Sequence, residues 1–160
     1  MLIKSQLTEK DFIKINLVLL YSKISIKIFT VLIFIFLLIT IVTVILIPSV
    51  SFTQLIVPVV MLLFLPLFTY FVAKRNFNIS NRISELIEYN FDNENLTMKG
   101  ESFNSQLSLD KIAKVAITKN WLLIWQNRQF ANPIPKRDIS ALQLTELKEI
   151  LDSKKVKNNL

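Results

Sequence analysis

The side chains best suited to chemistry in this chain are cations near its C-terminal end. Lys136 and Arg137 stand side by side after a short apolar stretch. Ammonium and guanidinium groups at the end of a strand can meet anionic lipid headgroups, and each contact contributes about 1 kcal/mol. If the fold brings further cations together, the same surface would include Lys111, Lys114, Lys119 and Arg128. The competing interpretation is that Arg137 pairs with Asp138 or a helix residue while Lys136 is solvated.

Catalytic chemistry finds little support in the composition. The chain has no histidine and no cysteine, so it lacks the commonest general base, the commonest transition-metal ligand and any disulfide framework. No glycine-rich phosphate loop, nucleophile elbow or metal-ligand spacing is present. The carboxylates of Asp92, Glu94 and Glu101 fall in expected turns, where solvated acids are ordinary. We therefore expect no enzyme activity, no cofactor and no metal site.

The elements that must position these cations begin with a long apolar segment. From Ile28 to Ala73 the chain runs 46 residues without a charged side chain. A soluble core is patterned, whereas this stretch is apolar on every side. A polar break around 48–54 divides it into spans at 28–47 and 55–73, each about 30 Å long at 1.5 Å per residue. The segment 28–73 thus predicts a two-helix transmembrane hairpin with no ionisable group at membrane depth, which favours an anchor over a transport pathway.

Positive charge flanks the hairpin on both sides. Residues 1–27 hold five lysines and two acids, and residues 74–160 hold 14 basic and 10 acidic side chains. Lysine and arginine near span ends are retained in the cytoplasm. We expect a two-span protein of the cell membrane with both termini cytoplasmic. The basic surplus of the soluble part is too small, and too poor in interleaved aromatics, to indicate nucleic-acid binding.

Residues 1–27 form a separate N-terminal cytoplasmic amphipathic segment in this interpretation. Thr8 followed by Asp11 resembles a capping box that starts a helix. The helix could lie on the inner leaflet or extend into the cytoplasm, and its phase indicates a break near Tyr21. The alternation over 24–28 also fits a short strand, so the sequence is compatible with either a helix or a strand there.

The remaining segment, 74–160, reads as a cytoplasmic domain of short strands followed by one helix. A polar neck precedes strands expected at 86–91, 96–99, 103–109, 112–118, 121–125 and 130–134. Ser140 and Gln143 form a capping box for a helix at about 140–153, after which a basic tail is expected to fray. The fold class is therefore an α+β membrane protein: a hairpin plus a small β domain closed by a C-terminal helix. Trp121 and Trp125 share one side of their strand and predict core packing or, alternatively, an aromatic partner surface.

Two short motifs carry a resemblance to a known family. They are the opening Leu7-Thr8-Glu9-Lys10-Asp11-Phe12 and the run Ile134-Pro135-Lys136-Arg137, followed after one residue by Ile139. With the paired spans, they make the chain similar to the YcxB-like family of small bacterial membrane proteins. The resemblance implies a pleckstrin-homology-like C-terminal domain, a bent sheet capped by a helix. The chain departs from the family pattern at Leu109, near the slot where a tryptophan often opens the strand containing Ile112.

Three functions follow as hypotheses. The first is a non-catalytic adaptor that presents the C-terminal domain at the inner leaflet to a protein or lipid partner. The second is an immunity or self-protection protein against a membrane-acting toxin or bacteriocin. The third is an accessory subunit of a membrane complex.

Overall fold

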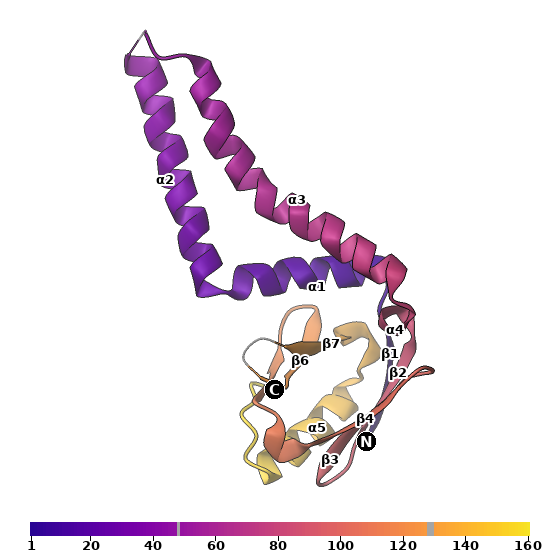
Figure 1. Ribbon diagram of the computed structural model, residues 1–160. Coiled ribbons are helices and arrows are strands. Elements are labelled where there is room, and N and C mark those ends of the chain that lie inside the picture. Colours follow the sequence, from indigo (N-terminus) through magenta and orange to yellow (C-terminus); the bar gives the residue numbers. More distant parts are fainter. Residues whose placement is uncertain (48, 128–129) are drawn as a thin grey trace. The chain divides into compact units, whose positions relative to one another are not determined.

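The structure is a computed structural model that describes residues 1–47, 49–127 and 130–160. It is an α+β protein that divides into two compact units. The sheet unit comprises Met1–Asp11 and Ile79–Leu160, and the helical unit comprises Phe12–Asn78. Figure 1 labels the elements of both units. Pro48, Arg128 and Gln129, which the sequence placed in turns or on the cationic surface, lie outside the described residues.

The helical unit begins within an amphipathic helix and contains two long apolar ones. Helix α1 runs over Glu9–Ser22, α2 over Ile24–Leu46 and α3 over Ile56–Ile79, with a short 3-10 helix, η1, at Phe52–Leu55. The break expected near Tyr21 is confirmed, because Lys23 is extended between α1 and α2. Residues 24–28 are helical, so the alternative of a short strand there is wrong.

The apolar helices are longer than the uncharged run. Helix α2 starts before Lys27, and α3 continues past Lys74 and Arg75 as far as Ile79. No glycine or proline stands beside Lys27, Lys74 or Arg75, and Lys and Arg themselves favour helix. The helices therefore continue through these charged residues. Helix α3 also continues through Pro66, although proline removes one backbone hydrogen bond from a helix. Two candidate membrane spans follow by length and hydropathy, Ile24–Leu46 and Phe52–Ile79.

The sheet unit contains two antiparallel sheets in the described residues. The first has the order β1-β2-β3-β4, formed by Leu2–Gln6, Leu86–Phe91, Asn95–Lys99 and Asn104–Ser108. The second has the order β5-β6-β7, formed by Lys114–Ile117, Trp121–Trp125 and Ala131–Pro135. Short helices lie at Asn81–Ser84 (α4), Leu109–Lys111 (η2) and Lys136–Asp138 (η3), and α5 spans Ala141–Ser153. The capping box of Ser140 and Gln143 is confirmed by reciprocal hydrogen bonds.

Strand β1 is the main departure from the sequence-based domain division. Residues 1–27 were expected to form one segment, but Met1–Asp11 belongs to the sheet unit and Phe12 onward to the helical unit. Strand β1 pairs with β2 from Leu2 opposite Asn90 to Gln6 opposite Leu86. Its residues alternate in burial, with Ile3 and Ser5 turned inward, as one face of a packed sheet requires. The whole helical unit is therefore inserted between two neighbouring strands.

One apolar core holds the sheet unit together. It is built from both sheets and α5, and its fully buried side chains include Ile3, Phe91, Leu122, Ile134 and Leu147. Pro133 lies inside β7, where an edge strand tolerates the missing N–H. The tail expected to fray is instead docked: the Val115 N–H donates to the Lys157 carbonyl at 2.9 Å, and Val156 joins the core. The last residues thus pair with the exposed edge of β5, a contact that their basic, polar composition does not predict.

Candidate functional site

The neighbouring cations Lys136 and Arg137 follow the end of β7 and lie in helix η3. Strand β7 ends in buried Ile134 and Pro135, and the chain then turns outward at Lys136. Lys136 is exposed, and its backbone N–H donates to the Asn120 carbonyl at 2.9 Å. The two neighbouring cations therefore have different surroundings, because Arg137 turns to a partner.

Arg137 binds the carboxylate of Asp11 through two guanidinium nitrogens. One nitrogen, Nη1, donates to Asp11 Oδ1 at 3.1 Å, and Nη2 donates to Oδ2. Its Nε also lies 3.5 Å from an oxygen of Asp138. The sequence alternative in which Arg137 pairs with Asp138 or a helix residue is thus observed in both forms, since Asp11 lies in the first turn of α1. Two-pronged guanidinium–carboxylate pairs combine charge with fixed geometry.

Asp11 has further donors on the same carboxylate. The Thr8 N–H and hydroxyl donate to Asp11 Oδ2 at 3.1 and 2.7 Å, and the Asp11 N–H donates back to the Thr8 hydroxyl at 3.2 Å. The hydrogen bond from Arg137, aided by those from Thr8, lowers the pKa of Asp11 to about 2. The capping box expected from Thr8 and Asp11 is confirmed, but its carboxylate also holds an arginine 126 positions away.

A second acidic group, Asp138, completes this junction. The Ser5 hydroxyl donates to Asp138 Oδ2 at 2.7 Å, so strand β1 is tied to η3 as well. The junction, which we define as Ser5, Thr8, Asp11, Arg137 and Asp138, joins the two sequence motifs that resemble the known family. Sequence reasoning identified Arg137 and Thr8 but missed the role of Ser5. The capping spacing was a signal for Asp11, whereas nothing local indicated its partner.

The other candidate cations fall at two ends of the β5–β6 hairpin. Lys114 begins β5 opposite Trp125, and its ammonium lies 4.9 Å from the Trp125 ring centre. Lys111 precedes it in η2. Lys119 lies in the turn that links β5 to β6, next to Asn120, which contacts Lys136. Among the described candidates, Lys111 and Lys114 thus form one exposed pair, and Lys119 and Lys136 form another.

The two tryptophans lie on the face of β6 opposite the core residues Leu122 and Ile124. Trp121 is buried and Trp125 half-buried, and neither belongs to the core cluster. The buried indole Nε1 of Trp125 has no hydrogen-bond partner among the described residues. Trp121 is therefore buried, as expected of a core residue, but it lies on the face of β6 that points away from the core cluster.

A second cluster surrounds Gly100, the only glycine in the chain. A Cβ at this position would lie 2.5 Å from both the Glu85 carboxylate and the Phe103 ring. The Arg82 guanidinium lies 3.9 Å from the centre of that ring. Glu85 accepts a hydrogen bond from the Ser102 N–H at 3.0 Å, which lowers the pKa of its carboxyl. These contacts tie the segment before β2 to the β3–β4 turn, so the cluster reads as structural.

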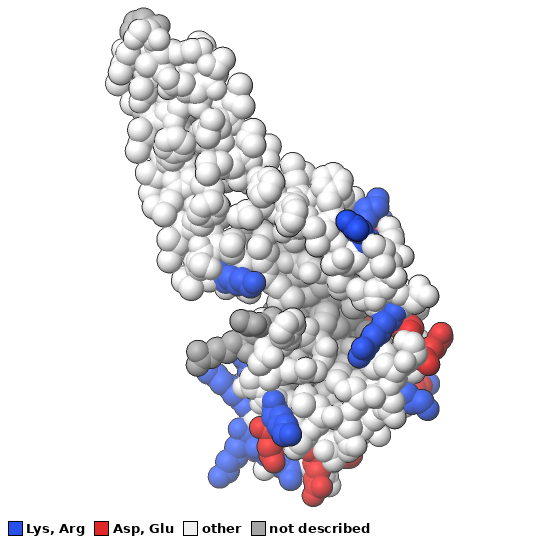
Figure 2. All heavy atoms as spheres, in the orientation of Figure 1, with Lys and Arg blue, Asp and Glu red and all other residues white. Residues whose placement is uncertain are grey.

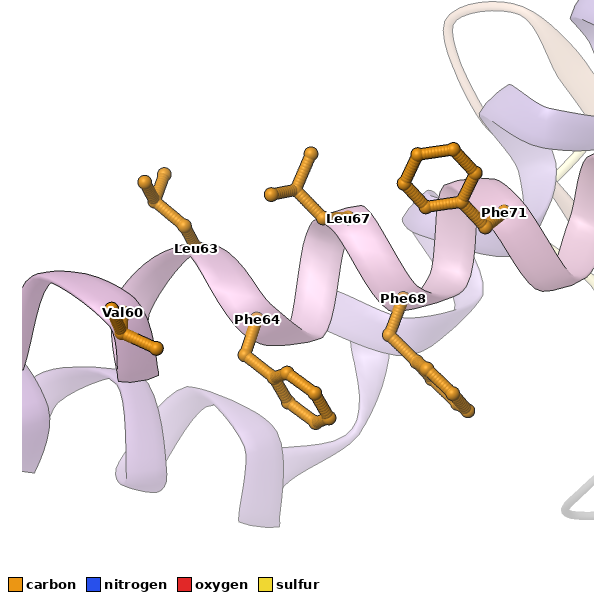
Figure 3. Close-up of a pocket in the computed structure, with 6 residues that line it drawn as sticks. All are labelled: Val60, Leu63, Phe64, Leu67, Phe68 and Phe71. Carbon is orange, nitrogen blue, oxygen red and sulfur yellow. The ribbon is translucent and has the colours of Figure 1, made fainter.

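A groove along α3 is lined only by hydrocarbon side chains. Figure 3 shows Leu63, Leu67 and Phe71 on one side of α3 and Val60, Phe64 and Phe68 on the other. The Phe64 and Phe68 rings stack with centres 5.6 Å apart. No polar side chain lines this groove, so it can offer contact to acyl chains or apolar side chains but no directional recognition.

A second hollow, near the α2–α3 turn, contains hydroxyl groups. It is lined by Phe36, Ile39, Thr40, Thr43, Gln54 and Val57. The Thr40 and Thr43 hydroxyls donate to the Phe36 and Ile39 carbonyls at 2.9 Å, so both are satisfied within α2. In the described part of the chain, no group of three or more acidic, histidine or cysteine side chains is placed to hold a metal ion.

Comparison with known proteins gives one match. Residues 91–151 match the model of a family described as YcxB-like protein. The matched segment runs from the end of β2 into α5 and includes Ile134 to Arg137. No curated protein and no solved structure matches the chain.

Proposed function

This chain carries a YcxB-like domain, and from that premise we propose that it is a non-catalytic adaptor anchored in a bacterial cell membrane. Helices α2 and α3 cross the bilayer, and the sheet unit is presented at the inner leaflet to a protein or lipid partner. The loop between the spans, around residues 49–55, faces outward. We further propose that the sheet unit is pleckstrin-homology-like, a proposal that its two antiparallel sheets and closing helix α5 support.

The exposure of α2 and α3 supports insertion. Both helices leave large apolar side chains uncovered along their length, for example Phe34, Leu38, Phe64 and Phe68, each about half exposed or more. Apolar area in contact with water costs about 25 cal/mol per Å², so a surface of this extent supports contact with hydrocarbon. Charged side chains occur in these helices only near the ends next to α1, at Lys27, Lys74 and Arg75, and Figure 2 shows no blue or red atoms on the far part of the hairpin.

The observation that carries the proposal is the pairing of β1 with β2 around the inserted helical unit. Strand β1 precedes the first apolar helix and β2 follows the second, yet the two strands share a sheet. Both must therefore lie on the same side of any bilayer that the helices cross. The cations Lys23, Lys27, Lys74 and Arg75 near the helix ends favour the cytoplasm as that side.

A cysteine-labelling experiment tests the topology, since the chain has no cysteine of its own. Ser51→Cys should react with a membrane-impermeant maleimide in intact cells, whereas Ser102→Cys should react only after lysis. Labelling of both positions, or of Ser102→Cys alone, in intact cells would contradict the proposed orientation.

Adaptor function is tested by photo-crosslinking in living cells from two positions. A photoreactive residue at Lys111, exposed on the sheet unit, should capture a discrete protein or lipid. One at Leu67 in α3 should capture bulk lipid. A discrete protein captured only from Leu67 would instead favour the immunity or accessory-subunit hypothesis, and toxin sensitivity after gene deletion would separate those two.

A further inference from the structure

The positive surplus of this protein lies in the helical unit. Between Phe12 and Asn78 the chain contains five cations, Lys14, Lys23, Lys27, Lys74 and Arg75, and no Asp or Glu. The sheet unit holds 14 basic and 12 acidic side chains, so its charges nearly balance. Two carboxylates, Glu9 and Asp11, lie in the first turn of α1 just before this unit begins, and Asp11 binds Arg137; the five cations outnumber them.

These five cations, which we call the basic collar, lie near the same ends of α2 and α3. Lys23 and Lys27 flank the start of α2, and Lys74 and Arg75 fall in the last two turns of α3. Helix α1, with Lys14, lies across these ends in Figure 1. The Phe12 and Phe77 rings, 6.0 Å apart, join the start of α1 to the end of α3. All five cations are exposed.

The collar also borders aromatic and apolar surface. Tyr21 in α1 and Tyr70 in α3 are partly exposed beside it, and Val18 lies on the same exposed stripe of α1 as Lys14. Tyrosine at the edge of an apolar helix is typical of the headgroup layer. A ligand here therefore meets cations and hydrocarbon side by side, which suits an amphiphile better than a soluble anion.

We propose that the basic collar binds anionic phospholipid headgroups of the leaflet at these helix ends. The phosphate oxygens accept hydrogen bonds from the lysine and arginine groups, and the acyl chains lie against α2 and α3. The proposal rests on the proposed membrane insertion and adds a lipid class to it. It also moves the lipid contact away from Arg137, which is held by Asp11, and from the divided lysines of the sheet unit.

The test compares two triple variants of the full chain. Lys14→Gln/Lys23→Gln/Lys27→Gln removes three collar cations. Lys111→Gln/Lys119→Gln/Lys136→Gln removes three exposed cations of the sheet unit and serves as the matched control. Each protein is equilibrated in mild detergent with an equimolar mixture of phosphatidylglycerol and phosphatidylcholine, captured, and its retained lipids are quantified. Parallel arms add high salt or an excess of soluble glycerol phosphate.

The wild-type chain and the control should retain an excess of phosphatidylglycerol. The collar variant should lose most of it, because each cation at a membrane surface contributes about fivefold in affinity. High salt should reduce the excess, whereas glycerol phosphate should not, since it lacks acyl chains. Displacement by glycerol phosphate would indicate a soluble phosphate ligand and overturn the lipid assignment.

Two further outcomes would also overturn it. One is equal retention of both lipids by the wild-type chain, and the other is an unchanged excess in the collar variant. Flotation with vesicles distinguishes the failure of this inference from that of the proposed function. A chain that floats with vesicles but shows no lipid preference refutes the collar alone, whereas a chain that does not float refutes the anchor.

Discussion

Leu122 and Leu63 have the same side chain and opposite surroundings. Leu122, in β6 of the sheet unit, is fully buried, and Leu63, in α3 of the helical unit, is 50% exposed. The sheet unit hides its apolar residues in one core and leaves charges of both signs outside. The helical unit leaves most of its large apolar side chains exposed along α2 and α3, and the cations of these two helices lie near one end of each. The two units thus differ in where their apolar side chains lie, and this difference supports the proposed insertion of the helical unit into a bilayer.

The chain leaves the sheet unit after Asp11 and returns to it at Ile79. The helical unit takes the place of a hairpin loop between β1 and β2, so the sheet is completed by a strand that precedes both apolar helices. The junction of Asp11 with Arg137 holds the first turn of α1 to the same sheet unit. Four predictions test this division, in order of expected effect.

The first prediction concerns the separability of the units. A chain with Gln6 joined directly to Leu86 through Asn-Gly should keep the sheet unit folded, because these residues already face each other and a two-residue turn fits antiparallel strands. Residues 86–160 alone should not fold, since they lack Ile3 and a whole paired strand, a loss comparable to the total stability of about 5–15 kcal/mol. Circular dichroism and cooperative unfolding measure both, and equal folding of the two fragments would show that β1 is dispensable.

The second prediction compares the same substitution in both units. Leu122→Ala should lower the free energy of unfolding of the sheet unit by about 2–5 kcal/mol, because it opens a cavity in a packed core. Leu63→Ala should change it by less than about 0.5 kcal/mol, because Leu63 contributes nothing to that core. Denaturant unfolding in detergent, followed by near-ultraviolet signals of the tryptophans, gives the two values. Similar losses would mean that the units unfold as one.

The third prediction addresses the only glycine. Gly100→Ala should cost about 1–3 kcal/mol, because its Cβ would overlap the Glu85 carboxylate and the Phe103 ring. Asn104→Ala, at an exposed position of the adjoining strand, is the control and should be close to neutral. Thermal unfolding of the three chains decides the matter, and an unperturbed alanine variant would show that Phe103 moves aside freely.

The fourth prediction concerns the junction. Asp11→Asn should destabilise the sheet unit by about 1–2 kcal/mol, the low end reflecting the solvent around Arg137. Because the folded pKa of Asp11 is lowered to about 2, its contribution is complete above the unfolded pKa near 3.8 and disappears as pH falls through 2. Stability measured between pH 5 and pH 2 should therefore decrease less in Asp11→Asn than in the wild-type chain. Parallel pH profiles would contradict the role of this pair.

Local signals in the sequence located many elements well. Strands β2 and β6 begin and end where expected, at Leu86–Phe91 and Trp121–Trp125, because turn-forming residues bound each of them. The capping boxes at Thr8 and Ser140 were readable because the two partners stand three residues apart. The length of the uncharged run predicted both apolar helices. The start of α2 was expected too late and the end of α3 too early, because a charged residue does not end a helix.

The cationic candidates show what such signals miss. Lys136 and Arg137 are equivalent by type and spacing, but only Arg137 is drawn to Asp11, and the other lysines divide between two ends of a hairpin. The docked tail was also missed, because its hydrogen bonds run to β5, about 40 positions earlier in the chain. No local pattern encodes either partner.

By itself the sequence determined that this chain has two long apolar helices, a run of short strands and a capped final helix, because composition, alternation and cap spacing are local. Only the tertiary structure decided that the first strand completes a sheet formed mainly after the apolar helices. It alone also paired Arg137 with Asp11 and set the collar cations apart from the balanced charges of the sheet unit. The physical reason is that strand pairing, ion pairs and burial join groups far apart in the chain, where proximity depends on the fold as a whole.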